Sequence, residues 1–205
     1  MKRIITISRE FGSGGRELGK RLSDELELPV YDHEIIEILA EEKKLAPEYV
    51  GSFSEKSFPL QYAATIANRF SVSYPVSSQQ LRLISDQEKL IRKLAEHDCI
   101  IVGRAADVLL AGENPFNIFV YADMKSKINR CLERAKPDEN LSEGALKSKI
   151  KKIARERADY HALFSDTPWG RKESYTLCVN TSGSEIKNLA PALAKYIESW
   201  FEARK

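Results

Sequence analysis

The sequence has few of the residues that build metal centres or disulfide frameworks. Its 205 residues include three cysteines and three histidines. Cys99, Cys131 and Cys178 are far apart in the chain and odd in number, which favours reduced cysteines that pack in the interior. No spacing among the cysteines and histidines matches a metal site, so we expect no metal held by these residues.

The sequence also lacks a large excess of one charge and any long apolar run. With 32 Lys and Arg against 30 Asp and Glu, its net charge is +2, which predicts no general affinity for nucleic acid or membranes. No apolar run approaches the roughly 20 residues of a membrane-spanning helix. Hydrophobic residues make up 42% and charged residues 30%, as in a soluble globular protein. We therefore expect a single cytoplasmic domain.

A glycine-rich turn near the start of the sequence carries its strongest functional signal. The run IITI at residues 4–7 predicts a buried strand, and Leu18, Leu22 and Leu26 mark the apolar stripe of a helix. Between them lies FGSGG, at residues 11–15. A strand, a glycine turn and a helix in this order direct backbone N–H groups at a phosphate. The alternative is an ordinary glycine-rich turn. The predicted phosphate-binding residues are Gly12, Ser13, Gly14, Gly15, Arg16 and Glu17.

This turn departs from the common phosphate-loop pattern G-x-x-x-x-G-K-[ST]. Arg9 holds the first glycine position, and Gly15 stands where the pattern has its lysine. Arg16 is the candidate for the missing cation, as a planar guanidinium instead of a point charge. No hydroxyl follows it, so Mg²⁺ would depend on Ser13, on Glu17 through water, or on the nucleotide itself.

Strand-like and helix-like segments alternate along the rest of the chain. Apolar runs predict further strands at 28–32, 99–104, 116–122 and 175–181, and helices separate them. Alternating strands and helices predict an α/β fold with a mostly parallel, doubly wound sheet. We expect a core of residues 1–45, 98–135 and 172–205, a helical insert at 46–97 with helices at 62–70 and 79–97, and a lid region at 136–171. The insert is either a flap over a substrate or a packed helical pair.

A few polar residues lie where a parallel sheet binds ligands. Asp32 follows the second strand, where it is either a helix N-cap or a residue of the ligand crevice. Arg104 follows the third strand and a glycine, which favours anion binding. Arg155 and Asp159 are four residues apart on a basic helix at 142–164, and we interpret the lysines of that helix as a solvated face.

Taken together, these motifs resemble the cytidylate kinase-like family of P-loop nucleoside monophosphate kinases. The resemblance rests on the opening TIS-x-x-x-GSGG-R-x-L-G, the strand ending at Asp32, the IIVGR strand, the basic helix and the ending WG…YTLCVN. It implies a three-layer P-loop NTPase fold with a five-stranded parallel sheet, a helical insert that binds the nucleoside monophosphate, and a helical lid. It also implies ATP with Mg²⁺ as donor and CMP or dCMP as acceptor.

The resemblance further implies roles for particular residues. Residues 12–17 would hold the donor phosphates. The residues that would bind the acceptor are Asp32, Arg104, Arg155 and Asp159. The candidate catalytic cations are Arg16, Arg155 and Arg157. Arg130 and Arg134, on the helix after the fourth strand, are weaker candidates.

Two departures from ordinary cytidylate kinases leave other functions open. The loop lacks the Walker lysine and threonine, and the lid lacks the arginine that would follow Asp159. The chain is therefore a CMP kinase, a kinase for another small acceptor, or a nucleotide-binding regulatory protein without catalysis. Its basic charge lies on one helix, which gives little support to a role in nucleic-acid binding.

Overall fold

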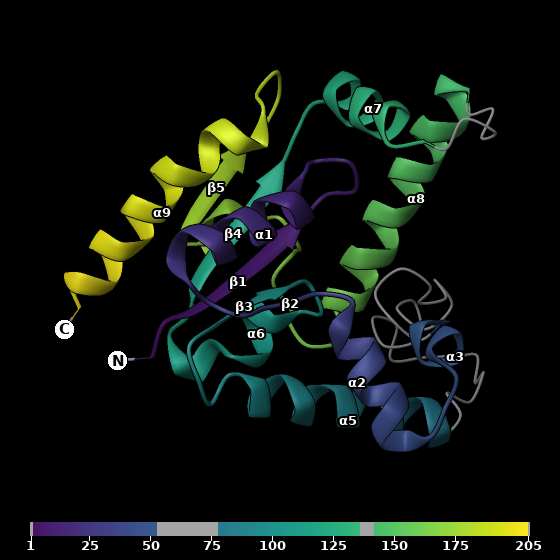
Figure 1. Ribbon diagram of the computed structural model, residues 1–205. Helices are drawn as coiled ribbons and strands as arrows, with labels where there is room; N and C mark the ends of the chain where they lie inside the picture. The colour runs from purple at the N-terminus through teal and green to yellow at the C-terminus, as the bar shows by residue number, and fades with distance from the viewer. Residues whose placement is uncertain (1, 53–77, 136–141, 205) are drawn as a thin grey trace.

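The computed structural model describes residues 2–52, 78–135 and 142–204. Its centre is a five-stranded sheet in the order β2-β3-β1-β4-β5, and every neighbouring pair is parallel. The predicted α/β class with a parallel sheet is confirmed, and Figure 1 shows helices on both faces of the sheet. The strands are β1 (Ile4–Arg9), β2 (Val30–Tyr31), β3 (Cys99–Val102), β4 (Phe116–Tyr121) and β5 (Leu177–Asn180).

The central strand β1 is buried along its whole length. Its side chains alternate between the two faces of the sheet, as the pleat of a strand requires. Ile5 and Ile7 pack into the hydrophobic cluster on one face, and Ile4 packs into the cluster on the other. Because both faces are covered, β1 reads as a continuous apolar run.

Two helices cover one face of the sheet. Helix α1 (Gly15–Leu26) presents the predicted stripe of Leu18, Leu22 and Leu26, all buried. Helix α9 (Ile186–Glu202) packs beside α1 on the same hydrophobic cluster. Leucines at this spacing lie on one side of a helix, and their burial fixes which side of α1 faces the sheet.

The other face is covered by α2 (Glu34–Lys43), α5 (Ser78–Leu94) and the short α6 (Ala106–Leu109), with α3 (Pro47–Ser52) packed beside α2. The helix predicted at 79–97 is confirmed as α5, although it ends at Leu94. The helix predicted at 62–70 lies outside the described residues.

Helices α7 (Met124–Glu133) and α8 (Glu143–His161) lie toward the carboxyl end of β1 (Figure 1). Asp123 caps α7, since its carboxylate accepts a hydrogen bond of 2.6 Å from the Ser126 N–H. One end of α8 packs through Leu146 and Ile150 near Phe11, and Tyr160 packs against Ala105 at the other end. Helix α8 therefore spans from the glycine loop to the end of β3.

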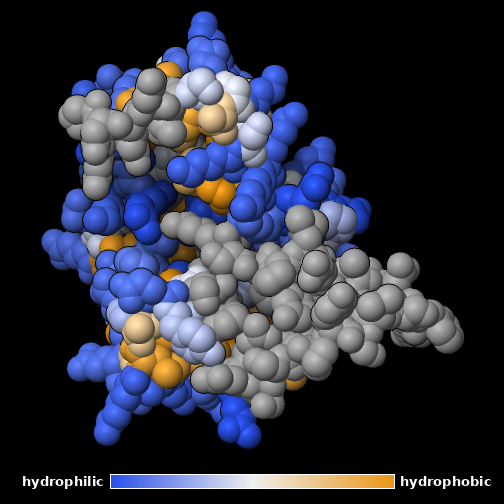
Figure 2. Space-filling model, turned by 90° about the vertical axis from the view of Figure 1, so that its right-hand side faces the viewer, coloured by the Kyte–Doolittle hydropathy of each residue, from blue (hydrophilic) through white to orange (hydrophobic). Residues whose placement is uncertain are grey.

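The exposed side of α8 is polar, as predicted. Figure 2 shows this face of the molecule, where most of the described side chains are hydrophilic. The exposed lysines of α8 are Lys147, Lys149, Lys151 and Lys152.

All three cysteines are free thiols, and Cys99 is buried in β3. Two short 3₁₀ segments, at Ala111–Glu113 and Lys172–Ser174, complete the described elements. Among the described helices, none has the length and apolar character needed to cross a membrane.

Candidate phosphate-binding site

The turn between β1 and α1 has the backbone of a ligand-binding loop. Gly12 and Gly14 have φ angles of +79° and +84°, a region that side chains with a Cβ rarely adopt. A Cβ on Gly12 would also lie 2.9 Å from the carbonyl oxygen of Lys127. Helix α1 begins directly after Gly14, so its first N–H groups point toward the loop.

A cavity of about 160 Å³ lies over this loop. Four of its lining residues are arginines, which come from β1, α1, the C-terminal cap of α7 and α8. The one carboxylate in the lining, that of Glu10, already pairs with Lys127 at 2.9 Å. Such a cationic cavity at a helix N-terminus suits a polyphosphate. The lining residues are Arg9, Glu10, Phe11, Gly12, Gly14, Gly15, Arg16, Arg134 and Arg157.

Arg157 connects α8 to the loop. Its side chain is buried, and its guanidinium donates a hydrogen bond of 2.6 Å to the carbonyl oxygen of Arg9. Arg155, two residues earlier, is exposed and does not line the cavity. Of the two lid arginines predicted to be catalytic, the structure therefore brings only Arg157 to the phosphate loop.

Asp32 lies at the end of β2 and pairs with two arginines. Its carboxylate accepts a hydrogen bond from the Nε of Arg16 and lies 3.4 Å from a guanidinium nitrogen of Arg9. The N-cap interpretation of Asp32 is wrong, because His33 occupies the N-cap position of α2 and makes no side-chain cap. The carboxylate is instead drawn to two cations that approach from β1 and α1.

The oxygen atoms near the loop that could bind a metal are already engaged. Glu17 pairs with Arg21 at 2.9 Å and with Arg134 at 2.5 Å. Ser13 is buried, and its hydroxyl donates to the carbonyl oxygen of Glu10 at 2.8 Å. Asp32 is also paired with cations. Among the described residues, no group of three or more His, Cys, Asp or Glu side chains is placed to hold a metal ion.

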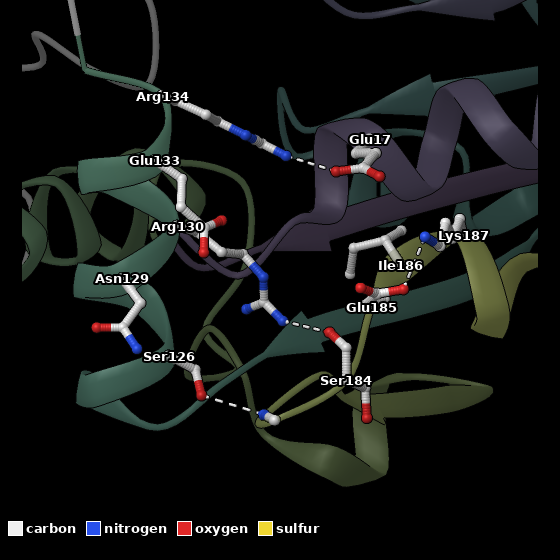
Figure 3. Close-up of a pocket in the computed structure, with 11 residues that line it drawn as sticks. Glu17, Ser126, Asn129, Arg130, Glu133, Arg134, Ser184, Glu185, Ile186 and Lys187 are labelled. Atoms are coloured by element: carbon white, nitrogen blue, oxygen red, sulfur yellow. Dashed lines mark hydrogen bonds and ion pairs between the residues drawn. The ribbon is translucent and has the colours of Figure 1, made fainter. Parts of the chain in front are cut away.

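A second pocket, of about 410 Å³, lies beside the first between α7, the start of α1 and the start of α9. Figure 3 shows Arg134 reaching toward Glu17 and Arg130 reaching toward the segment that contains Ser184. Arg134 lines both pockets. The second pocket therefore adjoins the cavity over the phosphate loop, and the two share Arg134 in their linings.

The segment after β5 is tied to the loop by hydrogen bonds. Arg130 donates to the carbonyl oxygens of Thr181, at 2.5 Å, and Ser184, at 2.9 Å. The Thr181 hydroxyl donates to the carbonyl oxygen of Ser13 at 2.7 Å. Arg130 therefore holds the segment after β5 beside the loop, whereas Arg134 pairs with Glu17 of α1. The sequence makes both weak candidates, since arginines on a helix need no ligand.

Among the remaining predicted residues, Arg104 lies near the end of α8, where Tyr160 packs against Ala105. Arg104 is buried at the end of β3, and its φ of +61° is unusual for a residue with a side chain. Near it, His161 of α8 pairs with Asp107 at 3.2 Å between Nε2 and Oδ2. Asp159 is half-buried, and burial raises the pKa of its carboxyl although the nearby Arg155 opposes this. Neither Arg104 nor Asp159 lines the loop cavity.

The sheet order β2-β3-β1-β4-β5, with a glycine loop between β1 and α1, defines an α/β P-loop NTPase fold of the kinase type. The sequence model of the cytidylate kinase-like family matches residues 4–183. The chain belongs to the cytidylate kinase-like family, as its motifs indicated.

Solved structures support the fold. An uncharacterized protein from Eubacterium ventriosum is 24% identical with a TM-score of 0.70, and the match covers 97% of this chain and 99% of that chain. Shikimate kinase from Bacteroides thetaiotaomicron is 14% identical with a TM-score of 0.55, over 96% of this chain and 98% of that one. Shikimate kinase from Acinetobacter baumannii, in complex with shikimate, is 11% identical with a TM-score of 0.52, over 97% and 94%. No curated protein sequence matches the chain.

Proposed function

We propose that this protein is an ATP-dependent phosphotransferase that phosphorylates CMP, dCMP or a related small acceptor. The observation that carries the proposal is the cavity over the glycine loop, which four arginines line. Membership of a kinase-like family supports the reaction class. The acceptor is inferred from the family resemblance of the Arg104 and Asp159 segments.

The proposed mechanism relies on position and charge, since phosphoryl transfer asks for little covalent chemistry from a protein. The backbone N–H groups of residues 12–16 hold the donor phosphates. Arg16 and Arg157 offset the charge that develops on the transferred group. Mg²⁺ enters as part of the MgATP substrate, and the Ser13 hydroxyl and, through water, the Glu17 carboxylate are the side chains that would contact it.

The pockets suggest where the two substrates lie. The pocket of about 410 Å³ beside the loop has room for the donor nucleoside. The acceptor would lie toward the end of α8 and β3, where Arg104 binds its phosphate and Arg155 and Asp159 bind its polar groups. Asp32 orients Arg16 through their ion pair.

Two other functions have specific observations in their favour. A different small acceptor is favoured by the fold shared with two shikimate kinases, one of them bound to shikimate. A nucleotide-binding regulatory role is favoured by Gly15, which stands where the common loop pattern has its lysine.

An ADP-release assay distinguishes the three functions. ATP and Mg²⁺ are supplied with CMP, dCMP, UMP, AMP or shikimate in turn, and we expect turnover with CMP or dCMP. Arg16→Ala should lower kcat/KM about 10–100-fold, because charge-assisted hydrogen bonds contribute about 1.5–3 kcal/mol. The control Lys151→Ala, at an exposed position of α8, should change it less than about threefold.

Each other outcome has a defined meaning. Turnover with shikimate alone would contradict the proposed acceptor and retain the reaction class. Thermal stabilisation by ATP without product from any acceptor would support the regulatory role. Equal losses in Arg16→Ala and Lys151→Ala would contradict the role given to Arg16.

A further inference from the structure

We propose that Arg9 supplies the interior cation of the phosphate loop, in place of the lysine that the common pattern has at position 15. This inference rests on the proposed function, since it deepens the account of the same site. It names a donor-phosphate ligand that the loop pattern does not contain, because the pattern has a glycine at position 9.

The side chains of residues 9 and 15 compete for one space. A Cβ on Gly15 would lie 2.5 Å from the Cβ of Arg9 and 2.9 Å from its Cγ. Such contacts are far inside van der Waals distance, and the Cβ of Arg9 is fixed by the backbone, so no change of rotamer relieves the 2.5 Å contact. An arginine at position 9 therefore excludes any side chain at position 15.

Position 15 requires a glycine because a Cβ there would clash with Arg9, and not because its backbone conformation is unusual. Gly12 and Gly14 have positive φ angles, whereas Gly15 does not and forms the first residue of α1. An L-residue would fit that backbone if Arg9 were absent. The arginine at position 9 and the glycine at position 15 are thus one coupled departure from the pattern. The cation comes from the end of β1 instead of the start of α1.

Arg9 is placed to act on a bound phosphate. It is the last residue of β1 and lines the loop cavity, and its side chain is 6% exposed compared with 52% for Arg16. A charge that is shielded from water interacts more strongly with a phosphate than one at the rim. Arg9 is therefore the interior cation, and Arg16 is the cation at the mouth of the cavity.

Two contacts hold Arg9 in this position. The carboxylate of Asp32 lies 3.4 Å from its guanidinium, and Arg157 donates a hydrogen bond of 2.6 Å to its carbonyl oxygen. Asp32 balances part of the charge while the loop is empty. A guanidinium has five N–H donors in a fixed plane, so it can hold a carboxylate on one edge and a phosphate on another.

Calorimetric titration of ATP and of ADP, each with Mg²⁺ and without acceptor, tests the coupled change. The variants are Arg9→Gly, Gly15→Lys and the double variant Arg9→Gly/Gly15→Lys. Arg9→Gly should weaken ATP binding at least tenfold. Gly15→Lys should lower the Tm, because its Cβ meets Arg9. The double variant, which restores G-x-x-x-x-G-K, should bind ATP at least tenfold more tightly than Arg9→Gly.

Further variants separate charge from structure. Arg9→Gln keeps the stem of the side chain without its charge, so it should weaken ATP binding while keeping the Tm within a few degrees. Arg3→Ala removes a partly exposed arginine just before β1, whose guanidinium pairs with Asp98. It should leave the Kd for ATP unchanged.

Binding without acceptor separates this inference from the proposed function. If the unaltered protein binds ATP and transfers no phosphate, the proposed kinase fails while the test of Arg9 stands. Unchanged affinity in Arg9→Gln, or a double variant no better than Arg9→Gly, would overturn the role of Arg9. A protein that binds neither ATP, ADP nor tripolyphosphate would overturn both.

Discussion

At the scale of single residues, the partly buried carboxylate of Asp159 destabilises the protein when no ligand is bound. Its Oδ2 is buried and accepts no hydrogen bond from the described residues, and burial raises the pKa of the carboxyl. A raised pKa in the folded state means that folding favours the protonated form. The stability present at low pH is therefore lost as the pH rises through that pKa.

Asp159→Asn should for this reason stabilise the protein at neutral pH and weaken acceptor binding. We expect the Tm at pH 7.5 to rise by roughly 1–4 °C, since about 0.5–1 kcal/mol shifts the Tm of a chain of this size by that amount. The gain should shrink toward pH 4, because Asp159 takes up a proton as the pH falls and its pKa is raised. Thermal melts at both pH values check this, with the exposed Asp24→Asn as the control. A lower Tm for Asp159→Asn at pH 7.5 would contradict it.

Local rules predicted the backbone of the loop better than the partners of its charged side chains. The glycines at positions 12 and 14 do adopt positive φ angles, because this preference belongs to the residue itself. The N-cap rule gave the wrong alternative for Asp32, since its actual partners, Arg9 and Arg16, come from segments that only the fold brings near. From the sequence, Arg9 could be recognised only as a departure from the first glycine of the loop pattern, and not as a residue of the cavity.

At the scale of elements, periodicity predicted the strands and helices well. The spacing of apolar residues in a sequence reflects which face of a strand or helix is buried, so the apolar runs and the leucine stripe of α1 were predictable. The first and last residues of the elements were predicted less accurately. The second strand was predicted over 28–32, yet only Val30–Tyr31 pair as a strand. Pro29 has no N–H to donate, and β2 lies at the edge of the sheet.

The connection between the segment after β5 and the phosphate loop gives a prediction about Thr181. This residue is fully buried, and its hydroxyl donates to the carbonyl oxygen of Ser13. Thr181→Val keeps the shape and removes the donor. We expect the Tm to fall by roughly 3–10 °C, because losing a buried hydrogen-bond partner costs about 1–3 kcal/mol. ATP binding should also weaken, because the loop loses a support.

Thr176→Val is the matched control for Thr181→Val. Thr176 lies just before β5 on an exposed surface, where its hydroxyl accepts a hydrogen bond of 3.2 Å from the Asn117 N–H. Its loss should change the Tm by less than about 1 °C, since water replaces the partner. Equal effects of the two valine variants, measured by thermal melting, would show that the Thr181 contact does not hold the loop.

At the scale of the whole molecule, α8 is the element that joins the two halves of the proposed site. It packs near Phe11 of the loop at one end, and His161 pairs with Asp107 at the other. Between these ends, Arg157 binds the backbone of Arg9. Binding of a ligand to the loop should therefore reduce local opening of α8, because a ligand that orders the loop also stabilises the helix bonded to it.

Hydrogen exchange followed by mass spectrometry measures this coupling. MgATP without acceptor should slow amide exchange both in residues 10–20 and in the second half of α8. Arg157→Ala removes the bond to Arg9, so the loop should still gain protection at saturating ATP while α8 gains little. Lys151→Ala, at an exposed position of the same helix, should keep both effects. Equal protection of α8 in Arg157→Ala and the unaltered protein would mean that the coupling does not pass through Arg157, and that packing near Phe11 carries it instead.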